Sequence, residues 1–299
     1  MHLVPSLFRK TSSSIPETDF SGVVAAVGKQ VPISPPSADD PFQHRYFPPG
    51  TAVFGSIPLA SHFKGPGALA EYLVIEVDSI SRKPDNISFA DASGLAVSGA
   101  TALTLLEEAN LKPGQRVLLN APCGGVGHFT CQLAREAIQS TGYIVGVCSS
   151  SKGDIAKTLG CDDTLDYNTS ADGKSLSSIL ASRFSGNDAF DVIIDCHGSQ
   201  PLWHGSPSCL KPGQDHPYIT VGPALGSYTY SGLIAGLGNL VANFALPVWA
   251  GGIDRPYKQI MTLANKEKLE TLREMVAENK LRTIVGGVWE LGDALEVIT

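Results

Sequence analysis

The sequence predicts an α/β protein whose main domain is a doubly wound parallel sheet. Two observations support this prediction. From Arg116 onward, short apolar segments of strand length alternate with segments in which apolar residues recur at helical spacing. A glycine-rich turn, Gly124-Gly125-Val126-Gly127, stands directly between the first of these strands and the helix that follows. Right-handed crossovers between such strands make a Rossmann-like topology the natural one.

Composition limits the class of protein before any element is assigned. The chain has 299 residues, of which 43% are hydrophobic and 17% charged, so it is too apolar for a disordered chain and can bury a large core. Its net charge of −7, without a long basic run, argues against a nucleic-acid partner. The six cysteines include no C-x-x-C pair, so they predict buried thiols rather than a structural zinc site.

The chain before the alternating region predicts two strands and one capped helix. The strands are expected at 52–56 and 69–77, because both segments are apolar and bounded by glycine or charge. Ser88 and Asp91 have the spacing of a capping box, in which each side chain satisfies a backbone N–H of the other residue. The helix that this box opens is predicted to run to about Ala109.

The strands and helices of the alternating region follow in order along the chain. Strands are predicted at 117–120, 143–148, 164–167, 191–196 and 218–221, with a sixth at 257–263. Helical spacing of apolar residues predicts helices from 126 to 138, around 155–159 and around 176–180. Short buried strands separated by helices are typical of a parallel sheet that is covered on both faces.

One long segment carries no charge. Residues 216–253 contain no Asp, Glu, Lys or Arg, and residues 232–250 have about the length of a membrane span. Asn239, Asn243 and Pro247 in that window argue against a span. We expect a helix that is buried by dimer packing or by the opposite domain, because soluble proteins rarely expose so large an apolar area. A membrane-associated protein held by residues 232–250 is the alternative.

The glycine-rich turn predicts a nucleotide-binding site. Its glycines let the backbone approach a pyrophosphate, and the N-terminal end of the next helix faces the phosphate oxygens. NAD-binding proteins usually carry Asp or Glu at the end of the second strand, where this chain has Ser149, Ser150 and Lys152. Hydroxyls and a lysine suit a 2′-phosphate, so NADPH is the predicted cofactor. The alternative role for the serines is to cap the following helix.

Three further groups are predicted to have no catalytic or metal-binding role. His128 is expected to face solvent from the first turn of its helix. Cys196 and His197 are neighbours at a strand end, so their side chains diverge and cannot form a nucleophile–base pair. Residues 196–209 hold two Cys and two His, but their spacing matches no usual metal site.

A series of segments follows one family pattern in order along nearly the whole chain. These segments are PETDFSGVVAAVG (16–28), GALAEYLV (67–74), KPDNISFADASGLAVSGATAL (83–103), LKPGQRVLLNAPCGGVG (111–127), LGCDDTLDYN (159–168), FDVIIDCHG (190–198), LKPG with YITVG (210–222) and ENKLRTIVGGVWELGDALEV (278–297). Together they resemble the zinc-independent medium-chain dehydrogenases/reductases, in the quinone oxidoreductase-like branch that includes zeta-crystallin and reticulon-interacting-protein-like proteins.

This resemblance implies the domain organisation. Residues 98–264 would be an NADP-binding Rossmann domain. Residues 1–97 would form a GroES-like catalytic β domain, to which the segment 265–299 returns. Compared with the family pattern, that catalytic domain is expected to lack its opening strands before residue 1 and its closing helix and strand after residue 299.

The resemblance also implies the cofactor site. The turn from Ala121 to Gly127, including Cys123 and Val126, would hold the pyrophosphate of NADPH. The remaining cofactor residues implied are Ser149, Ser150, Lys152 and Tyr167 at the 2′-phosphate, Thr101 near the nicotinamide, and Gly222 at the end of the YITVG segment. No side chain stands out as catalytic. No metal is expected, because the chain lacks the G-H-E segment and the cysteine-rich lobe of zinc-dependent relatives.

The activity implied is hydride transfer from NADPH to a quinone or an electron-poor alkene, so the expected partner is a small molecule. A different class of function stays open, namely an NADPH-binding partner or assembly protein with little turnover. The expected location is the cytoplasm. A mitochondrial presequence is the alternative, because Arg9 and Lys10 precede a run of serines, although residues 1–15 align with an interior part of the family pattern.

Overall fold

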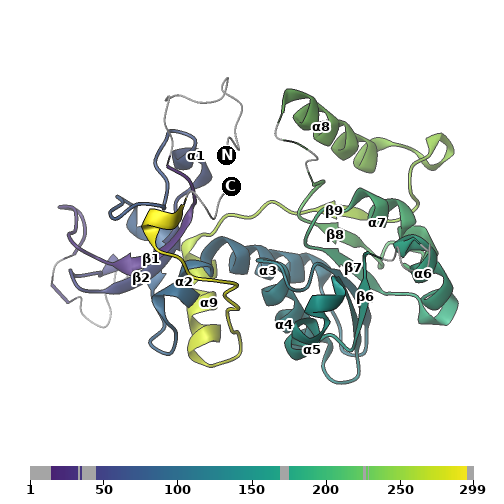
Figure 1. Cartoon of the computed structure of the whole chain (residues 1–299), viewed down its shortest axis with the longest axis horizontal. Helices are drawn as coiled ribbons and strands as arrows, with labels where there is room; N and C mark the ends of the chain where they lie inside the picture. Colours follow the sequence, from purple (N-terminus) through teal and green to yellow (C-terminus); the bar gives the residue numbers. More distant parts are fainter. Residues whose placement is uncertain are drawn as a thin grey trace. The chain divides into compact units, whose positions relative to one another are not determined.

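The computed structural model describes residues 15–32, 34, 35, 45–168, 175–224, 227 and 229–294. The chain divides into two compact units. Unit 1 consists of Met1–Ala100 and Thr262–Thr299, and unit 2 of Thr101–Met261. The division falls within one helix, α3 (Ala96–Ala109) (Figure 1). Residues 1–14, on which the alternative of a presequence depends, lie outside the described residues.

Unit 1 contains a small antiparallel sheet of three strands. They are β1 (Asp19–Val23), β2 (Ala52–Ser56) and β3 (Ile80–Arg82), with β2 in the middle. Phe47, Val53 and Ile80 form the buried cluster that holds this sheet. The strand predicted at 52–56 is confirmed as β2, whereas β1 and β3 were not predicted from the sequence.

The strand predicted at 69–77 is wrong. No strand passes through these residues, and the side chain of Val74 is fully exposed. The N–H of Leu69 donates a hydrogen bond to the carbonyl of Pro16 at 3.1 Å, but residues 71–77 pair with no described strand. A strand exists only where a neighbouring strand supplies hydrogen-bonding partners, so an apolar pattern by itself could not establish one here.

The predicted capping box is confirmed. Ser88 Oγ accepts a hydrogen bond from the N–H of Asp91, and Asp91 Oδ2 accepts one from the N–H of Ser88, both at 3.1 Å. The helix opened by this box, α2 (Phe89–Ser93), ends at Gly94, and α3 begins two residues later. The single helix predicted from this box is therefore two helices, because the chain turns at the glycine.

Two further helices complete unit 1. They are α1 (Leu59–His62) and α9 (Lys266–Ala277), and neither was predicted from the sequence. Asn265 caps α9 through its side-chain oxygen, which accepts from the N–H of Lys268 at 3.0 Å. Leu272 of α9 packs against Gly99, where an added Cβ would lie 2.7 Å from Leu272 Cδ2. The segment after residue 262 thus packs into the core of unit 1.

Unit 2 is built on a six-stranded parallel sheet, which confirms the predicted fold class. The strand order is β6-β5-β4-β7-β8-β9. The strands are β4 (Arg116–Asn120), β5 (Tyr143–Cys148), β6 (Asp163–Asp166), β7 (Val192–Asp195), β8 (Tyr218–Thr220) and β9 (Tyr257–Gln259). From β4 the chain winds outward through β5 and β6, and from β7 it winds the other way, so the winding reverses between β4 and β7.

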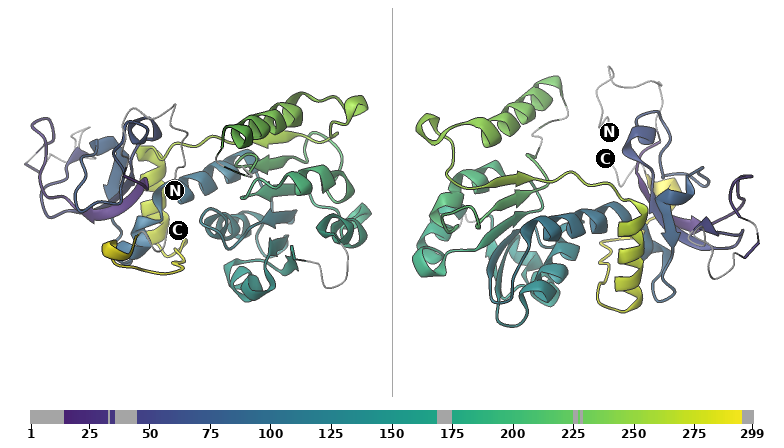
Figure 2. Two further views of the ribbon diagram at one scale, coloured as in Figure 1. Left: turned by 45° about the horizontal axis from the view of Figure 1, so that its top comes forward. Right: turned by 180° about the vertical axis from the view of Figure 1, so that it is seen from behind.

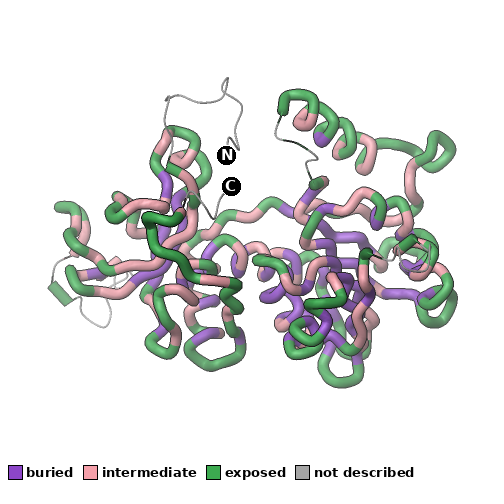
Figure 3. The backbone as a smooth tube through the Cα atoms, in the orientation of Figure 1, coloured by how far each residue is buried: buried purple, intermediate pink, exposed green. Residues whose placement is uncertain are grey.

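Helices cover both faces of this sheet (Figure 2). The helices are α4 (Gly127–Ile138), α5 (Gly153–Leu159), α6 (Leu176–Arg183) and α7 (Gln200–Gly205). Leu119 packs with Cys131 of α4 on the face that α3, α4 and α5 cover, whereas Leu118 packs with Trp203 of α7 on the face of α6 and α7. Neighbouring strand residues point to opposite faces, and helices cover both faces. The buried segments therefore lie mainly in the sheet (Figure 3).

The charge-free segment forms α8 (Tyr230–Ala245) and a short 3-10 helix, Val248–Ala250. Gly236 is the one buried residue recorded for α8, and Ile234 is 71% exposed. Within the single chain α8 is therefore largely exposed, whereas β8 in the same segment is buried. Burial of α8 by dimer packing or by the opposite domain stays a prediction. Among the described helices, none has the length and apolar character needed to cross a membrane.

Candidate functional site

The glycine-rich turn joins β4 to α4 at the carboxyl end of the sheet. Ala121 begins the turn with a φ of 60°, a backbone conformation uncommon for a residue with a side chain. Its carbonyl accepts a hydrogen bond from the N–H of Gly124 at 3.1 Å. A Cβ added at Gly127 would lie 1.9 Å from the same carbonyl oxygen. Position 127 therefore requires glycine, and the start of α4 packs directly against the end of β4.

Side chains leave the N-terminal end of α4 open. The residue at its N-cap, Val126, has no side-chain oxygen that could accept hydrogen bonds from the N–H groups of the first turn. Gly124 and Gly125 are exposed beside it, and Cys123 is half-buried. A helix end of this kind offers backbone N–H groups and the positive end of the helix dipole to an anion. The predicted residues from Cys123 to Gly127 thus have the arrangement that a phosphate group needs.

His128 does not face solvent, contrary to the expectation. Its side chain is 5% exposed, and its Nδ1 lies 2.9 Å from the carbonyl oxygen of Gly124. Burial lowers the pKa of His128 below its ordinary value, so the ring is neutral and donates to Gly124 from Nδ1. Nε2 is buried without a hydrogen-bonding partner among the described residues. The hydrogen bond from this buried ring holds the carbonyl of Gly124 in place.

The polar residues after β5 lie on a short 3-10 helix, Ser150–Lys152. Ser149 precedes it and is half-buried, while Ser150 and Lys152 are exposed. The hydroxyl of Ser149 lies 3.1 Å from that of Ser151. No side chain caps this 3-10 helix or the following α5, so the alternative role of the serines as helix caps is wrong.

The glycine-rich turn and the 3-10 helix are in contact. The thiol of Cys123 donates a hydrogen bond to the carbonyl of Lys152, with a distance of 3.5 Å between sulfur and oxygen. Burial raises the pKa of the Cys123 thiol above its ordinary value and that of Cys148 to about 11, so both are protonated at neutral pH. Cys123 therefore connects the two parts of the site and is not a nucleophile.

Asp166, at the end of β6, was not assigned from the sequence. Its Oδ2 accepts a hydrogen bond from the N–H of Ser150 at 3.0 Å, and its Oδ1 accepts one from the N–H of Asn168 at 2.7 Å. These bonds, chiefly the one from Asn168, lower the pKa of Asp166. The ionised carboxylate lies beside Tyr167, whose side chain is 56% exposed. The negative charge of Asp166 would repel a 2′-phosphate bound beside the ends of β5 and β6, whereas the positive charge of Lys152 would attract one.

Thr101 and Gly222 lie on other parts of unit 2. Thr101 is a half-buried residue of α3. Gly222 follows β8 with a φ of 113°. A Cβ added at Gly198, in the loop after β7, would lie 1.8 Å from the carbonyl oxygen of Gly222. The loops after β7 and β8 are therefore in contact, and Gly222 belongs to the same edge of the sheet as the glycine-rich turn.

Asp195, at the end of β7, is fully buried and was not assigned from the sequence. Its two carboxylate oxygens accept five hydrogen bonds from β4, β8 and the loop after β7. The donors are Asn120 Nδ2 at 2.7 Å, the N–H groups of His197 and Gly198 at 3.0 Å, the N–H of Ser199 at 2.6 Å and Tyr218 Oη at 2.6 Å. The sequence signal that could have identified Asp195 was an acidic residue at the end of an apolar strand, as in DVIIDC (191–196).

The residues next to Asp195 form no catalytic pair. The thiol of Cys196 donates to Thr130 Oγ1 at 3.6 Å, and burial raises the pKa of Cys196 to about 12. Its sulfur is therefore neither ionised at neutral pH nor bonded to the His197 ring. In the described part of the chain, including residues 196–209, no group of three or more His, Cys, Asp or Glu side chains could hold a metal ion.

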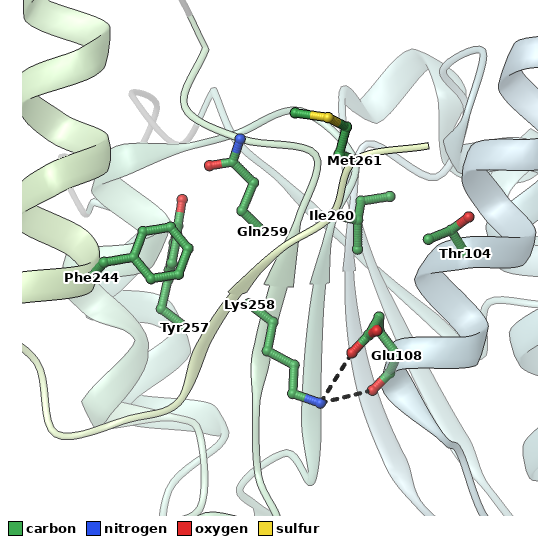
Figure 4. Close-up of a pocket in the computed structure, with 8 residues that line it drawn as sticks. All are labelled: Thr104, Glu108, Phe244, Tyr257, Lys258, Gln259, Ile260 and Met261. Atoms are coloured by element: carbon green, nitrogen blue, oxygen red, sulfur yellow. Dashed lines mark hydrogen bonds and ion pairs between the residues drawn. The ribbon is translucent and has the colours of Figure 1, made fainter. Parts of the chain in front are cut away.

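A cavity of about 370 Å³ lies among α3, α8 and β9 (Figure 4). Lys258 Nζ, at one end of it, lies 3.3 Å from Glu108 Oε2. The lining residues are Thr104, Glu108, Phe244, Tyr257, Lys258, Gln259, Ile260 and Met261. None of them was predicted to bind the cofactor. The predicted residue Gly222 lies beside the lining residue Gln259, because a Cβ added at Gly222 would lie 2.8 Å from Gln259 Nε2. The cavity thus adjoins one predicted residue and does not include the glycine-rich turn.

Comparison with known proteins identifies relatives along most of the chain. Residues 125–230 match a family model described as zinc-binding dehydrogenase. The chain is 31% identical over 301 residues to the medium chain reductase pydE of Acremonium sp, covering 94% of this chain and 76% of that protein. It is 30% identical over 306 residues to the trans-enoyl reductase poxH of Penicillium oxalicum, covering 96% of this chain and 75% of that protein.

Solved structures share the fold. A quinone oxidoreductase from Coxiella burnetii superposes with a TM-score of 0.67 at 24% identity, covering 95% of this chain and 75% of that one. A mycobacterial protein complexed with NADPH superposes with a TM-score of 0.65 at 20% identity, covering 93% of this chain and 76% of that one. At these identities the likeness concerns the fold.

Proposed function

This chain belongs to the medium-chain dehydrogenase/reductase family, and we propose that it is an oxidoreductase that transfers hydride from NADPH to a quinone or an activated alkene. One relative is named a trans-enoyl reductase, and a quinone oxidoreductase has the same fold. The observation that carries the proposal is the turn after β4, where Gly127 packs against the carbonyl of Ala121 and α4 begins without a side-chain cap.

The cofactor is assigned to unit 2, and the catalytic domain to unit 1 with its small antiparallel sheet. Backbone N–H groups from Gly125 to Gly127 would bind the pyrophosphate, and the neutral ring of His128 would hold the turn in place. Thr101 and Gly222 are assigned to the nicotinamide end, as the family resemblance implies. When bound, the cofactor supplies the hydride, while the protein orients the cofactor toward the acceptor.

The preference for NADPH over NADH is assigned to the rim formed by the ends of β5 and β6. Ser149 and Ser150 offer hydroxyl donors, and Lys152 offers a charge that forms no ion pair with any described residue. The carboxylate of Asp166 already accepts from two backbone N–H groups, so its charge is partly compensated. Lys152 is therefore the residue expected to decide between the two nucleotides.

The substrate site is proposed to work without a dedicated acid. Asp195 holds the backbone of residues 197–199 through three N–H groups and so fixes the loop beside the glycine-rich turn. Hydride adds to one carbon of the activated double bond, and water supplies the proton for the other. The chain lacks the G-H-E segment of zinc-dependent relatives, which supports a reaction without metal.

Calorimetry with NADPH and NADH, followed by assays of NADPH oxidation with a set of quinones and enones, tests the proposal. We expect tight binding of NADPH, weaker binding of NADH, and oxidation of NADPH that depends on the acceptor. If neither nucleotide bound, the assignment of the cofactor site would be overturned. Binding of NADPH without turnover of any acceptor would instead favour a nucleotide-binding partner or assembly protein.

A further inference from the structure

Two buried thiols of unit 2 lie against each other. The sulfur atoms of Cys131, on α4, and Cys161, in the turn between α5 and β6, are 3.4 Å apart. Cys131 is 0% exposed and Cys161 5%, and both belong to the apolar cluster on one face of the parallel sheet. Neither thiol has a role in the candidate cofactor site.

The chain around these two thiols holds them side by side. Helices α4 and α5 are neighbours (Figure 1), and Arg135 follows Cys131 by one turn on the same side of α4. Its Nε and Nη2 donate to the carbonyl of Gly160 at 3.0 and 2.8 Å, and its guanidinium forms an ion pair with Asp162. Gly160 and Asp162 are the residues on either side of Cys161. The two cysteines are therefore held together by bonds that involve no sulfur.

The other four thiols have different surroundings. Three of them donate to oxygen atoms at distances of 3.5, 3.6 and 3.7 Å, namely Cys123 to the carbonyl of Lys152, Cys196 to Thr130 Oγ1 and Cys209 to the carbonyl of Ser206. Cys148 lies beside Cys123. Cys131 and Cys161 instead have each other's sulfur as partner, so they are placed for a bond between sulfur atoms.

We propose that Cys131 and Cys161 form a disulfide when unit 2 folds in the presence of a low-molecular-weight disulfide. The thiolate of one cysteine attacks a sulfur of that reagent, forms a mixed disulfide and releases one thiolate of the reagent. The thiolate of the other cysteine then attacks the sulfur of the first cysteine and releases the second. The two cysteines are oxidised, and the reagent is reduced to two thiols that take up the two protons the cysteines lose.

The geometry allows this bond after a small movement. A disulfide has a sulfur–sulfur distance of about 2.0 Å, so the two sulfur atoms must approach each other by about 1.4 Å. Gly146 of β5 leaves space for the Cys161 sulfur, which would lie 2.8 Å from a Cβ added at that glycine. The bond would close a loop from residue 131 to residue 161. Closing such a loop restricts the unfolded chain, so the oxidised form should be the more stable one.

Oxidation is assigned to folding because the folded chain protects both thiols. Cys131 and Cys161 are almost out of contact with solvent, and the hydrogen bond with Cys131, together with burial, raises the pKa of Cys161. A protonated thiol is a poor nucleophile. The folded reduced chain should therefore keep its thiols and the oxidised chain its disulfide. The redox conditions during folding then decide which of the two forms persists.

The test refolds the denatured, reduced chain once with a mixture of oxidised and reduced glutathione and once with dithiothreitol. The folded products are then unfolded, their thiols are counted with Ellman's reagent, and linked peptides are identified by mass spectrometry. We expect the glutathione product to have a bond between Cys131 and Cys161 and two thiols fewer than the six of the dithiothreitol product. It should melt at a temperature about 5–10 °C higher. Chain secreted into the oxidising bacterial periplasm is a second source of the oxidised form.

Cys161→Ala should abolish both the bond and the difference in melting temperature between the two products, because the second sulfur is absent. Cys209→Ala is the matched control, since Cys209 is as deeply buried but donates to the carbonyl of Ser206, and both effects should remain. The peptide map of the unsubstituted chain is decisive even where a variant does not fold.

Three results would overturn the proposal. The first is a glutathione product that keeps all its thiols. The second is a bond between Cys123 and Cys148, or glutathione attached to Cys123, without a bond between Cys131 and Cys161. The third is oxidation of Cys131 and Cys161 within minutes in the folded chain, which would contradict their protection. The inference does not depend on the proposed function, since no measurement uses a nucleotide or a substrate.

Discussion

Asn120 Nδ2 donates a hydrogen bond to Asp195 Oδ1 at 2.7 Å, and both side chains are buried. The two residues are directly opposite in the pairing of β4 with β7, the place where the winding of the sheet reverses. Ligands of open α/β sheets bind outside the carboxyl ends of the strands at such a reversal. The pair therefore ties the strand before the glycine-rich turn to the loop at 197–199, on the two sides of the expected crevice.

Replacing Asp195 with Asn should destabilise unit 2. The new amide group donates where the carboxylate accepted, so the N–H of Ser199 or Tyr218 Oη loses its buried acceptor. We expect a loss of about 3 kcal/mol in the free energy of unfolding, measured by urea denaturation. Asp188→Asn, at an exposed ion pair, is the matched control and should change it by less than about 1 kcal/mol. Equal effects of the two substitutions would contradict the role given to Asp195.

Replacing Lys152 with Ala should weaken NADPH binding and leave NADH binding nearly unchanged. The reason is that NADPH alone carries the 2′-phosphate that this exposed ammonium is proposed to meet. The expected loss is roughly 1–3 kcal/mol in binding free energy, measured by calorimetry. Lys157→Ala, on the exposed side of α5, removes the same charge outside the site and serves as the control. Equal affinity of the parent chain for the two nucleotides would refute this prediction.

Replacing Gly127 with Val should abolish nucleotide binding. The added Cβ would lie 1.9 Å from the carbonyl oxygen of Ala121, so the turn and the start of α4 must move apart. Gly238→Ala is the control, because no atom lies within 4 Å of a Cβ added there. Fluorescence titration with NADPH measures the affinity, and circular dichroism verifies that both variants fold. A folded Gly127→Val variant with normal affinity would show that the turn does not bind the cofactor.

Asp19 should make unit 1 more stable in mildly acidic solution. Burial, opposed by a hydrogen bond from the N–H of Val97 at 2.8 Å, raises the pKa of Asp19 from 3.8 to about 6. The folded chain therefore holds this proton more tightly than the unfolded chain, so the contribution is fully present below about pH 4 and is lost as the pH rises through 6. Allowing for partial exposure, we expect about 2 kcal/mol.

The pH dependence of Asp19 is measured as the difference in melting temperature between the parent chain and Asp19→Asn from pH 4 to pH 8. The neutral amide cannot titrate, and its oxygen can still accept from Val97. We expect the variant to gain stability relative to the parent as the pH rises. Asp85→Asn, at an exposed position, should run parallel to the parent over the same range. Parallel curves for Asp19→Asn as well would mean that Asp19 has an ordinary pKa.

Features that depend on neighbours in the chain could be predicted from the sequence. The capping box of Ser88 and Asp91 forms because the two residues are three positions apart. The predicted bounds of β5 agree with the structure, and those of β4, β6, β7 and β8 agree to within about two residues, because strand length and apolar content are local properties. The glycine-rich turn was recognisable for the same reason, since its strand, glycines and helix are consecutive.

The candidate site could be predicted only in part. The turn and the polar residues after β5 belong to contiguous motifs, whereas Asp166 reaches Ser150 from a strand sixteen positions away in the chain. Asp195 likewise collects donors from β4 and β8, which the sequence does not bring together. His128 was expected in solvent because helical position alone does not show that the ring is buried and bonded to the carbonyl of Gly124.

The sequence by itself determined the alternation of strands and helices, the glycine-rich turn and the absence of charge from residue 216 to residue 253. Only the tertiary structure decided that residues 69–77 form no strand, that α9 packs Leu272 against Gly99, and that α8 leaves Ile234 and Leu237 exposed. The physical reason is that helical spacing and turn geometry are set by adjacent residues. Strand pairing, burial and the filling of a packing surface depend instead on segments that meet only after the chain has folded.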